Sequence, residues 1–386
     1  MDTQNRITLQ NGVVYGGNWE TAAADLTVSG ERIAKIGDGM PAGTVLDVSG
    51  CTLIPGFIDI HIHGCAGADT CDATPEALEA MSASLAEKGV TSFCPTSMTL
   101  PEETLKKVFC NVQAQMGKEP GAYIHGVHME GPYLSPAKKG AQNGAYLLPP
   151  DAESFRKLYD ACGGCICLVD IAPEETGAEN FVRQVSPYCT VSMAHTAAGY
   201  KETVEAVRWG IRHATHLYNA MSGLNHRNPG VVGAVLDMAR EWGIMGELIC
   251  DGFHIHPAAL RIAFAMLGED NSIVVSDSMR AAAYRDGEYN LGGQKVTVKA
   301  GKALLDDGTI AASTTNMYAE FLNILSYGIP WRQAVKSTSW NPARSIGVEK
   351  DTGSLEEGKF ADIVALDGDN RIRLVMAKGK IIVNNL

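Results

Sequence analysis

Short β-rich runs alternate with longer segments of helical period through the middle of this chain. The eight runs span residues 57–63, 90–95, 123–129, 166–171, 189–195, 212–217, 246–251 and 272–277. Strands that alternate with helices form parallel sheets through right-handed crossovers. Eight such units predict an α/β fold of the (β/α)8 TIM-like barrel type. A doubly wound sheet is the competing architecture, but it usually has fewer strands, and no glycine-rich phosphate-binding sequence follows the first run.

Both ends of the chain have a different pattern. Val, Ile and Leu alternate there with polar residues, and Gly and Asp punctuate the short runs. We expect the two ends to pair into one small β-sandwich domain made of residues 1–54 and 346–386, with the barrel spanning residues 55–345. Helices predicted over 315–327 and 330–338 would connect the barrel back to this β-rich domain.

Composition excludes several classes of protein. Of 386 residues, 45% are hydrophobic and 20% charged, which is ordinary for a globular chain and rules out disorder as the main state. The net charge of −12 disfavours nucleic acid as a partner, because its phosphate backbone is also negative. No apolar run reaches the roughly 18 residues of a membrane span. The N-terminus lacks the basic start and apolar stretch of a secretory signal, so we expect a cytoplasmic protein with no membrane partner.

Ten cysteines are spread along the chain, mostly inside apolar segments. This distribution indicates buried, reduced thiols, as in proteins of a reducing compartment. A zinc site at Cys162, Cys165 and Cys167 is an alternative, but no second Cys or His pair at ligand spacing follows. We therefore expect Cys165 and Cys167 to open an apolar strand.

Metal-ligating residue types fall at the ends of five of the predicted strands. They are His61 and His63 in the first, Glu130 after the third, His195 in the fifth, His216 in the sixth and Asp277 in the eighth. The C-terminal ends of all barrel strands open on one face, so these residues would converge there. His61 and His63 are two apart, and alternate residues of a strand point to the same side. Imidazole and carboxylate ligands suit Zn²⁺ or Fe²⁺, so the pattern predicts a divalent metal site.

Other histidines and one arginine need separate interpretations. His128 lies two residues before Glu130 and can share its face, either beside the ligands or in the core. His213 lies three residues before the ligand of the sixth run, so we expect it to face the core or a helix. Arg227 and His254 lie in loops after the sixth and seventh runs, on the same rim as the ligands. Phosphate binds near the last strands of many barrels, so this rim can receive a phosphorylated ligand.

Several longer motifs resemble those of the N-acetylglucosamine-6-phosphate deacetylases, a family within the amidohydrolase superfamily. The most specific are HMEGP, THLYNAM and HRNPG, while PGFIDIHIHG and GKFADIV resemble amidohydrolases generally. The resemblance runs over essentially the whole chain. It implies a metal-dependent hydrolase that removes the acetyl group from N-acetylglucosamine 6-phosphate, an amino-sugar phosphate, with glucosamine 6-phosphate and acetate as products.

The resemblance also implies roles for the candidate ligands. Glu130, His195 and His216 match the main metal site of the family. His61 and His63 match positions that carry a second metal in some members, so one or two ions per subunit, zinc or iron, are expected, with Glu130 as the bridging ligand. Asp277 matches the catalytic acid and base and can also contribute to the metal site.

Substrate contacts follow from the same resemblance. The backbone at Asn219 and Ala220, with Arg227 and His254, matches the region that holds the sugar phosphate. The family is typically a homodimer, which implies that Arg227 can serve the site of the neighbouring subunit. Further contacts to substrate are implied at Ala141, Gln142, Ile310, Ala311 and Ala312.

Two positions depart from the family pattern. Gln142 stands where the family usually has a histidine that polarises the acetyl carbonyl, and glutamine can donate only a neutral hydrogen bond. The loop after Asp277 carries Arg280, Tyr284 and Arg285, which we expect to add bulk and charge above the site. These departures leave the galacto epimer or an unphosphorylated sugar as alternative substrates. Another amidohydrolase reaction on a small amide and a non-catalytic scaffold are the remaining alternatives.

Overall fold

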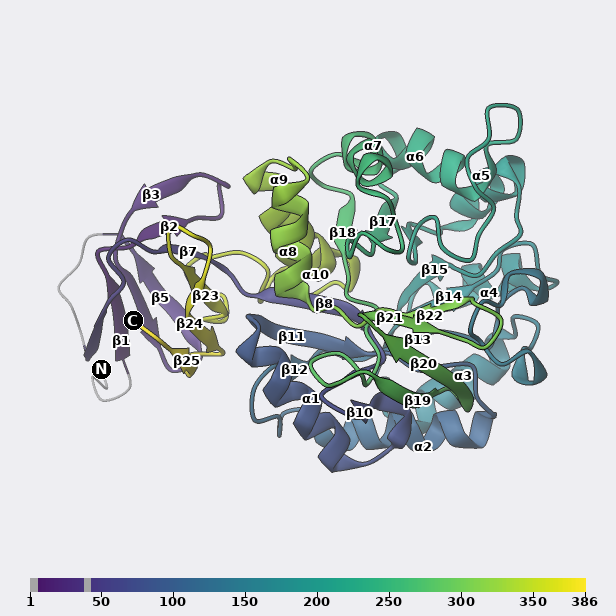
Figure 1. The fold of residues 1–386 in the computed structure, drawn as a ribbon, viewed down its shortest axis with the longest axis horizontal. Coiled ribbons are helices and arrows are strands. Elements are labelled where there is room, and N and C mark those ends of the chain that lie inside the picture. Colours follow the sequence, from purple (N-terminus) through teal and green to yellow (C-terminus); the bar gives the residue numbers. More distant parts are fainter. Residues whose placement is uncertain (1–5, 38–42) are drawn as a thin grey trace.

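The computed structural model describes residues 6–37 and 43–386 and contains two units (Figure 1). The larger is a curled parallel sheet surrounded by helices, and the smaller is a β-rich unit that holds both chain ends. This confirms the expected TIM-like barrel with a small β-rich domain. The predicted domain division at residues 54 and 346 stays a prediction. The first five residues of the predicted β-sandwich domain, at the start of the sequence predicted to lack a secretory signal, lie outside the described part of the chain.

The barrel strands correspond to the eight β-rich runs, with the third run divided into two short strands. Their bounds are β8 (Phe57–Ile62), β11 (Val90–Pro95), β12 (Tyr123–Ile124), β13 (Val127–Met129), β14 (Ile166–Ile171), β15 (Thr190–Met193), β16 (His213–Ala214), β17 (Met245–Leu248) and β18 (Ser272–Val274). Neighbours pair in parallel from β8 to β12 and from β13 to β18. The Asp277 N–H donates to the His61 carbonyl at 2.9 Å, which brings the last strand end beside the first.

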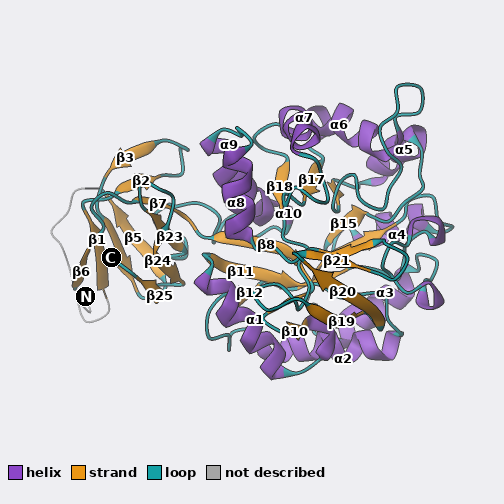
Figure 2. Ribbon diagram, in the orientation of Figure 1, coloured by secondary structure: helices purple, strands orange, loops and turns teal. Residues whose placement is uncertain are grey.

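Helices cover the outside of the barrel (Figure 2). Those of the repeating units are α1 (Pro75–Glu87), α2 (Glu102–Gln115), α3 (Ala152–Ala161), α4 (Ala178–Val185), α5 (Tyr200–Trp209), α6 (Gly230–Trp242) and α7 (Pro257–Leu267). The sequence of α1 shows why such segments are helical: the Thr74 hydroxyl caps the Ala77 N–H and Pro75 stands in the first turn. Leu78, Met81 and Leu85 form its buried face.

After the last barrel strand the chain forms α8 (Met317–Ser326), α9 (Trp331–Val335), a π-helical turn (Lys336–Trp340) and α10 (Asn341–Ser345). These match the two predicted connecting helices, but the second continues through the π turn. Short 3₁₀ turns span Thr70–Asp72, Pro136–Lys138 and Gly144–Tyr146. Within the described ranges, no helix has both the length and the apolar character that crossing a membrane requires.

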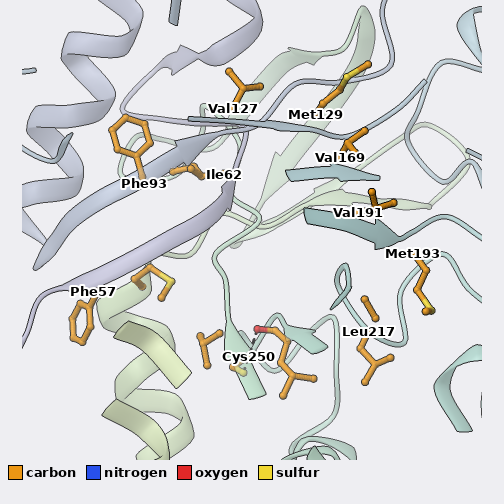
Figure 3. Close-up of a cluster of buried hydrophobic side chains, with 14 of the residues drawn as sticks. Phe57, Ile62, Phe93, Val127, Met129, Val169, Val191, Met193, Leu217 and Cys250 are labelled. Atoms are coloured by element: carbon orange, nitrogen blue, oxygen red, sulfur yellow. Dashed lines mark hydrogen bonds between the residues drawn. The ribbon is translucent and has the colours of Figure 1, made fainter. Parts of the chain in front are cut away.

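The core of the barrel unit lies between the strands and the surrounding helices. Figure 3 shows Phe57, Phe93, Val127, Val169 and Val191 projecting from successive strands into this layer. All of them are almost completely buried. This close packing holds the strand ends in fixed positions, which the site requires.

The β-rich unit is built from two sheets. The order of the first is β5–β4–β1–β6, and its strands are β1 (Arg6–Gln10), β4 (Leu26–Ser29), β5 (Arg32–Ile36) and β6 (Thr44–Asp47). The second has the order β25–β24–β23–β7–β2–β3, with β2 (Val13–Tyr15), β3 (Thr21–Ala23), β7 (Thr52–Pro55), β23 (Ile363–Leu366), β24 (Ile372–Ala377) and β25 (Lys380–Asn384). Because β23 pairs with β7, the C-terminal strands complete a sheet that the N-terminal segment begins.

A four-stranded antiparallel sheet follows the last barrel strand and was not expected from the sequence. It consists of β19 (Gly287–Leu291), β20 (Gln294–Lys299), β21 (Lys302–Leu304) and β22 (Ile310–Ala312). A separate pair, β9 (Gly64–Cys65) with β10 (Ala68–Asp69), follows β8. The four-stranded sheet packs its apolar side, including Val296 and Val298, against Met98 and Met279 beside the barrel mouth.

All ten cysteines are unpaired thiols. Cys167 lies in β14 and Cys165 directly precedes it, as expected for residues that open an apolar strand. Over the described ranges, the clusters that could hold a metal ion contain histidine and glutamate only.

Candidate active site

The six predicted ligands meet at the C-terminal ends of the barrel strands. Glu130 is central, because its Oε1 lies 3.1 Å from the Nε2 atoms of both His195 and His216, and its Oε2 lies 3.3 Å from the Nε2 of His63. Asp277 Oδ1 lies 3.3 Å from His63 Nε2 and 3.5 Å from His61 Nε2. All these side chains are buried or nearly so. Residues from five strands therefore form one cluster.

The local backbone conformation directs several of these side chains toward the site. His195, His216 and Asp277 have positive φ angles of 42°, 31° and 46°. Residues other than glycine rarely adopt this region, and each instance costs on the order of 1–3 kcal/mol. The strain falls on three residues that each follow a parallel strand, where the chain must leave the sheet. The surrounding packing holds these strained residues in place.

The first group of ligand atoms fits a metal ion. His195 Nδ1 lies 2.9 Å from the carbonyl oxygen of Lys138, which can only accept, so Nδ1 carries the proton and Nε2 presents a lone pair. That Nε2 lies 3.1 Å from His216 Nε2 and 3.1 Å from the Glu130 carboxylate. Electron-rich atoms this close to one another suit a shared cation, and two imidazoles with a carboxylate are ordinary ligands of zinc.

A second group shares the same carboxylate. His61, His63 and Glu130 also place one ligand atom each within 4.8 Å of one another. The Nε2 of His61 is buried and has no hydrogen-bond partner in the described structure. An orphaned buried nitrogen that faces two carboxylates is the feature expected of a ligand to a second cation.

The neighbouring histidines oppose the effect of burial on the pKa values of the two carboxyl groups. Burial raises the pKa of Glu130, but the close imidazoles of His195, His216 and His63 outweigh it and hold the pKa well below its usual value. Burial likewise raises the pKa of Asp277, and the neighbouring His61 and His63 bring it below the ordinary value. Both carboxyl groups are therefore ionised near neutral pH.

Five of the six cluster residues, all but His61, line a cavity of about 280 Å³. Seven of the nine predicted substrate contacts line it: Ala141, Gln142, Asn219, Ala220, His254, Ile310 and Ala311. Ala312 instead lines an adjoining cavity of about 210 Å³, which shares His254 and Ile310 with the first. Arg227 is exposed on the loop between β16 and α6 and lies outside the lining of the cavity in its own chain.

His254 is held at the cavity by Asp251. The carboxylate Oδ2 of Asp251 lies 2.8 Å from His254 Nδ1, and its Oδ1 accepts the backbone N–H of His254 at 2.9 Å. Burial lowers the pKa of His254, but the hydrogen bond and charge of Asp251 outweigh it and raise the pKa above the usual value. The pair thus favours a positively charged imidazole at the cavity wall.

Gln142 lines the cavity, and both ends of its amide are engaged. Its Oε1 accepts the backbone N–H of Thr99 at 2.7 Å, and its Nε2 donates to Glu130 Oε2 at 2.8 Å. The bond to Glu130 uses one of the two N–H groups of the amide, so the contact of Gln142 with a substrate carbonyl stays a prediction.

The expectation that Arg280 adds charge above the site was wrong, while that for Tyr284 and Arg285 stays a prediction. Arg280 turns toward Asp72 at 2.8 Å and Asp69 at 3.5 Å, and neither it, Tyr284 nor Arg285 lines the cavity. The two carboxylates attract the guanidinium away from the site, and they precede this loop by about 200 residues of sequence, so no local pattern indicates the pairing.

Several residues at the site had no role in the sequence analysis. Met98 and Thr309 line the cavity, and Glu247 in β17 contacts two ligand residues from below. Only Glu247 carried a usable signal, since a carboxylate inside an apolar strand is rarely buried without a partner.

The chain is similar to several known proteins. The chain is 40% identical over 335 residues to the N-acetylglucosamine-6-phosphate deacetylase of Bacillus subtilis (strain 168), covering 85% of this chain and 84% of that protein. It is 34% identical over 333 residues to the N-acetylgalactosamine-6-phosphate deacetylase of Escherichia coli O157:H7, covering 85% and 87% of the two chains.

Among solved structures, a mutant N-acetyl-D-glucosamine-6-phosphate deacetylase of Mycobacterium smegmatis in complex with N-acetyl-D-glucosamine-6-phosphate superposes with a TM-score of 0.90 at 30% identity. The match covers 98% of this chain and 99% of that one. The signature of the amidohydrolase family matches residues 52–382, which include the whole barrel and most of the C-terminal strands. The chain therefore belongs to the amidohydrolase family.

Proposed function

We propose that this chain is a metal-dependent deacetylase that hydrolyses N-acetylglucosamine 6-phosphate to glucosamine 6-phosphate and acetate, in amino-sugar catabolism. The observation that carries the proposal is the buried cluster of four histidines and two carboxylates beside a sugar-sized cavity. The activity named for the similar proteins from Bacillus subtilis and Mycobacterium smegmatis supports the choice of substrate.

Glu130, His195 and His216 would hold the main divalent ion, zinc or iron, and His61 and His63 with Glu130 would hold a second one. The neutral nitrogen and carboxylate oxygen donors on these residues suit either metal. A bound cation of this kind lowers the pKa of water toward neutrality and polarises a carbonyl oxygen.

Asp277 would move the proton. Its ionised carboxylate accepts a proton from the attacking water as the oxygen bonds to the acetyl carbon. The same carboxyl then returns the proton to the sugar nitrogen as the carbon–nitrogen bond breaks, which releases acetate and a free amine. The lowered pKa of Asp277 supports this assignment, because the base must be ionised before the reaction begins. Gln142 would hold Glu130 in place through its amide N–H.

The phosphate end of the substrate would face Asn219, Ala220 and His254. A charged imidazole at His254 supports this placement, since it attracts a phosphate dianion. Arg227 is exposed and lies outside its own cavity, so we assign it to the site of a neighbouring subunit in a cytoplasmic homodimer. Ala141, Ile310, Ala311 and Ala312 would complete the contacts with the sugar.

The galacto epimer is the second candidate substrate. The similarity to the Escherichia coli protein named for N-acetylgalactosamine 6-phosphate favours this substrate. The two sugars differ only in configuration at C4, so one cavity can fit either.

An acetate-release assay tests the proposal. Both phosphorylated epimers and the two free sugars are offered to the purified chain with Zn²⁺, with Fe²⁺ and after treatment with a chelator. We expect the fastest release from N-acetylglucosamine 6-phosphate and loss of activity on chelation that added metal restores. No acetate from any phosphorylated sugar in the metal-loaded enzyme would reject the proposal.

A further inference from the structure

A ring of buried polar side chains lies inside the barrel beneath the metal-ligand cluster. Its members come from six strands or strand ends and are His61, Glu247, His213, Ser192, Thr215, Asp170 and His128. Hydrogen bonds join His61 to Glu247 and connect His213 through to His128, while His213 Nε2 lies 3.6 Å from Glu247 Oε1. Every member is essentially inaccessible to solvent. Burial of this many polar groups is costly unless each has a defined partner, so the ring constrains the side chains above it.

Glu247 is the member of this ring that contacts two ligand residues. Its Oε2 lies 2.9 Å from His61 Nδ1 and accepts the backbone N–H of His216 at 3.1 Å. His61 belongs to the candidate second metal group and His216 to the main one. A single carboxyl oxygen therefore connects the two halves of the cluster.

The backbone contact indicates which atom of His61 carries the proton. Oε2 of Glu247 accepts an N–H from His216, so we infer that any carboxyl proton lies on Oε1 and that Oε2 also accepts from His61. His61 Nδ1 is then the donor, and the lone pair of a neutral His61 is left on Nε2. That Nε2 is the buried atom without a partner, 3.5 Å from Asp277 and 3.8 Å from Glu130.

Neighbouring groups offer His61 no comparable alternative. The His128 ring packs edge-on against the His61 ring with centroids 4.5 Å apart. Its own nitrogens are engaged with the Ile60 carbonyl at 3.1 Å and Asp170 at 3.0 Å. The packing limits rotation of the His61 ring, and Glu247 selects its tautomer.

We propose that Glu247 is a positioning residue that fixes the tautomer and orientation of His61 and thereby enables the chain to hold a second cation beside the first. This rests on the proposed metal centre. A carboxylate behind a metal-bound histidine commonly changes metal affinity by about 10–100-fold. Glu247 acts on the second cation through His61. Its contact with the His216 backbone fixes the position of the main ligand group relative to the second one.

The test compares Glu247→Leu with Glu247→Gln. Leucine removes the acceptor, whereas the glutamine side-chain oxygen can still accept from His61 and His216. A matched control is Glu320→Leu, which removes another fully buried carboxyl whose described partner is the backbone N–H of Cys250. Each chain is equilibrated with buffered Zn²⁺, and bound metal per chain is measured by elemental analysis.

We expect two zinc ions per chain in the wild type, in Glu247→Gln and in the Glu320 control. In Glu247→Leu the affinity for the second ion should fall about 10–100-fold, with the first ion retained. Two ions bound with unchanged affinity in Glu247→Leu would overturn the proposal, and so would a single ion in the wild type.

A second measurement covers the case in which Glu247→Leu does not fold. Nitrogen-15 NMR of the metal-free wild-type chain reports which His61 nitrogen carries the proton, with the signal assigned by its loss in His61→Asn. We expect the proton on Nδ1, and a proton on Nε2 would overturn the proposal. Neither readout uses catalysis, so failure to release acetate would reject the proposed function without deciding the role of Glu247.

Discussion

Replacement of Asp277 by asparagine gives the most direct test of how the site works. Asparagine has nearly the same shape, and the bonds that hold the residue are made by its backbone: its N–H donates to His61 at 2.9 Å and its carbonyl accepts from Ser313 at 2.8 Å. The fold and the position of the side chain should therefore survive. The change removes the ability of the side chain to accept and return a proton.

The expected loss follows from that single function. General acid–base catalysis contributes about 10²–10⁴-fold, which corresponds to roughly 2.7–5.4 kcal/mol at about 1.36 kcal/mol for each factor of ten. We therefore expect kcat to fall by about 10²–10⁴-fold. Asp277 Oδ1 lies 3.3 Å from His63 Nε2 and 3.5 Å from His61 Nε2, longer than a strong charge-assisted hydrogen bond. Loss of these contacts should disturb the site little, so KM should change only a few-fold.

The pH profile should change in the same variant. Burial raises the pKa of Asp277 but the adjacent histidines outweigh it, so the carboxylate loses its charge only as the pH falls through a lowered folded-state pKa. Activity of the wild type should decline on that acidic side, and the residual activity of Asp277→Asn should not show the same decline.

Steady-state acetate release, with bound metal measured on the same samples, provides the assay. Asp72→Asn is the control, since it removes a carboxylate that pairs with Arg280 outside the cavity and should leave kcat within about twofold of the wild type. Turnover of Asp277→Asn within tenfold of the wild type, at equal metal content, would refute the assignment of Asp277 as the base.

Three further predictions concern the remainder of the cavity. Arg227→Ala should raise KM for the 6-phosphorylated sugar far more than for the free sugar, and equal changes in both would contradict a phosphate role. Gln142→Leu leaves the buried N–H of Thr99 without an acceptor, which costs about 1–3 kcal/mol, so its melting temperature should fall relative to the wild type; an unchanged value would show that this contact is not important. Since Asp251 raises the pKa of His254, KM for the phosphorylated sugar should increase as the pH rises through that pKa. Asp251→Asn should move this increase to lower pH, and a profile identical to the wild type would argue against a charged His254.

Most of the barrel was accessible from the sequence because its strands are buried and short. Runs such as residues 90–95 are rich in β-branched and apolar residues, and caps such as Thr74 with Pro75 mark where the helices begin. The sheet from β19 to β22 was missed because its strands are partly exposed, as the burial of Gln294–Lys299 alternates along the strand. The Gly292–Gly293 turn between β19 and β20 was a usable hairpin signal.

The sequence by itself determined which residues gather at the site. Ligand residue types stand at the ends of β-rich runs, and a barrel brings all strand ends to one face. Only the tertiary structure decided how those residues are held. Glu247 and His61 are 186 positions apart, Gln142 bonds Glu130 at the cavity wall, and Arg280 turns to acids about 200 positions away. Hydrogen-bond partners depend on side-chain direction in three dimensions, whereas the periodicity of a sequence records only which face of an element is buried.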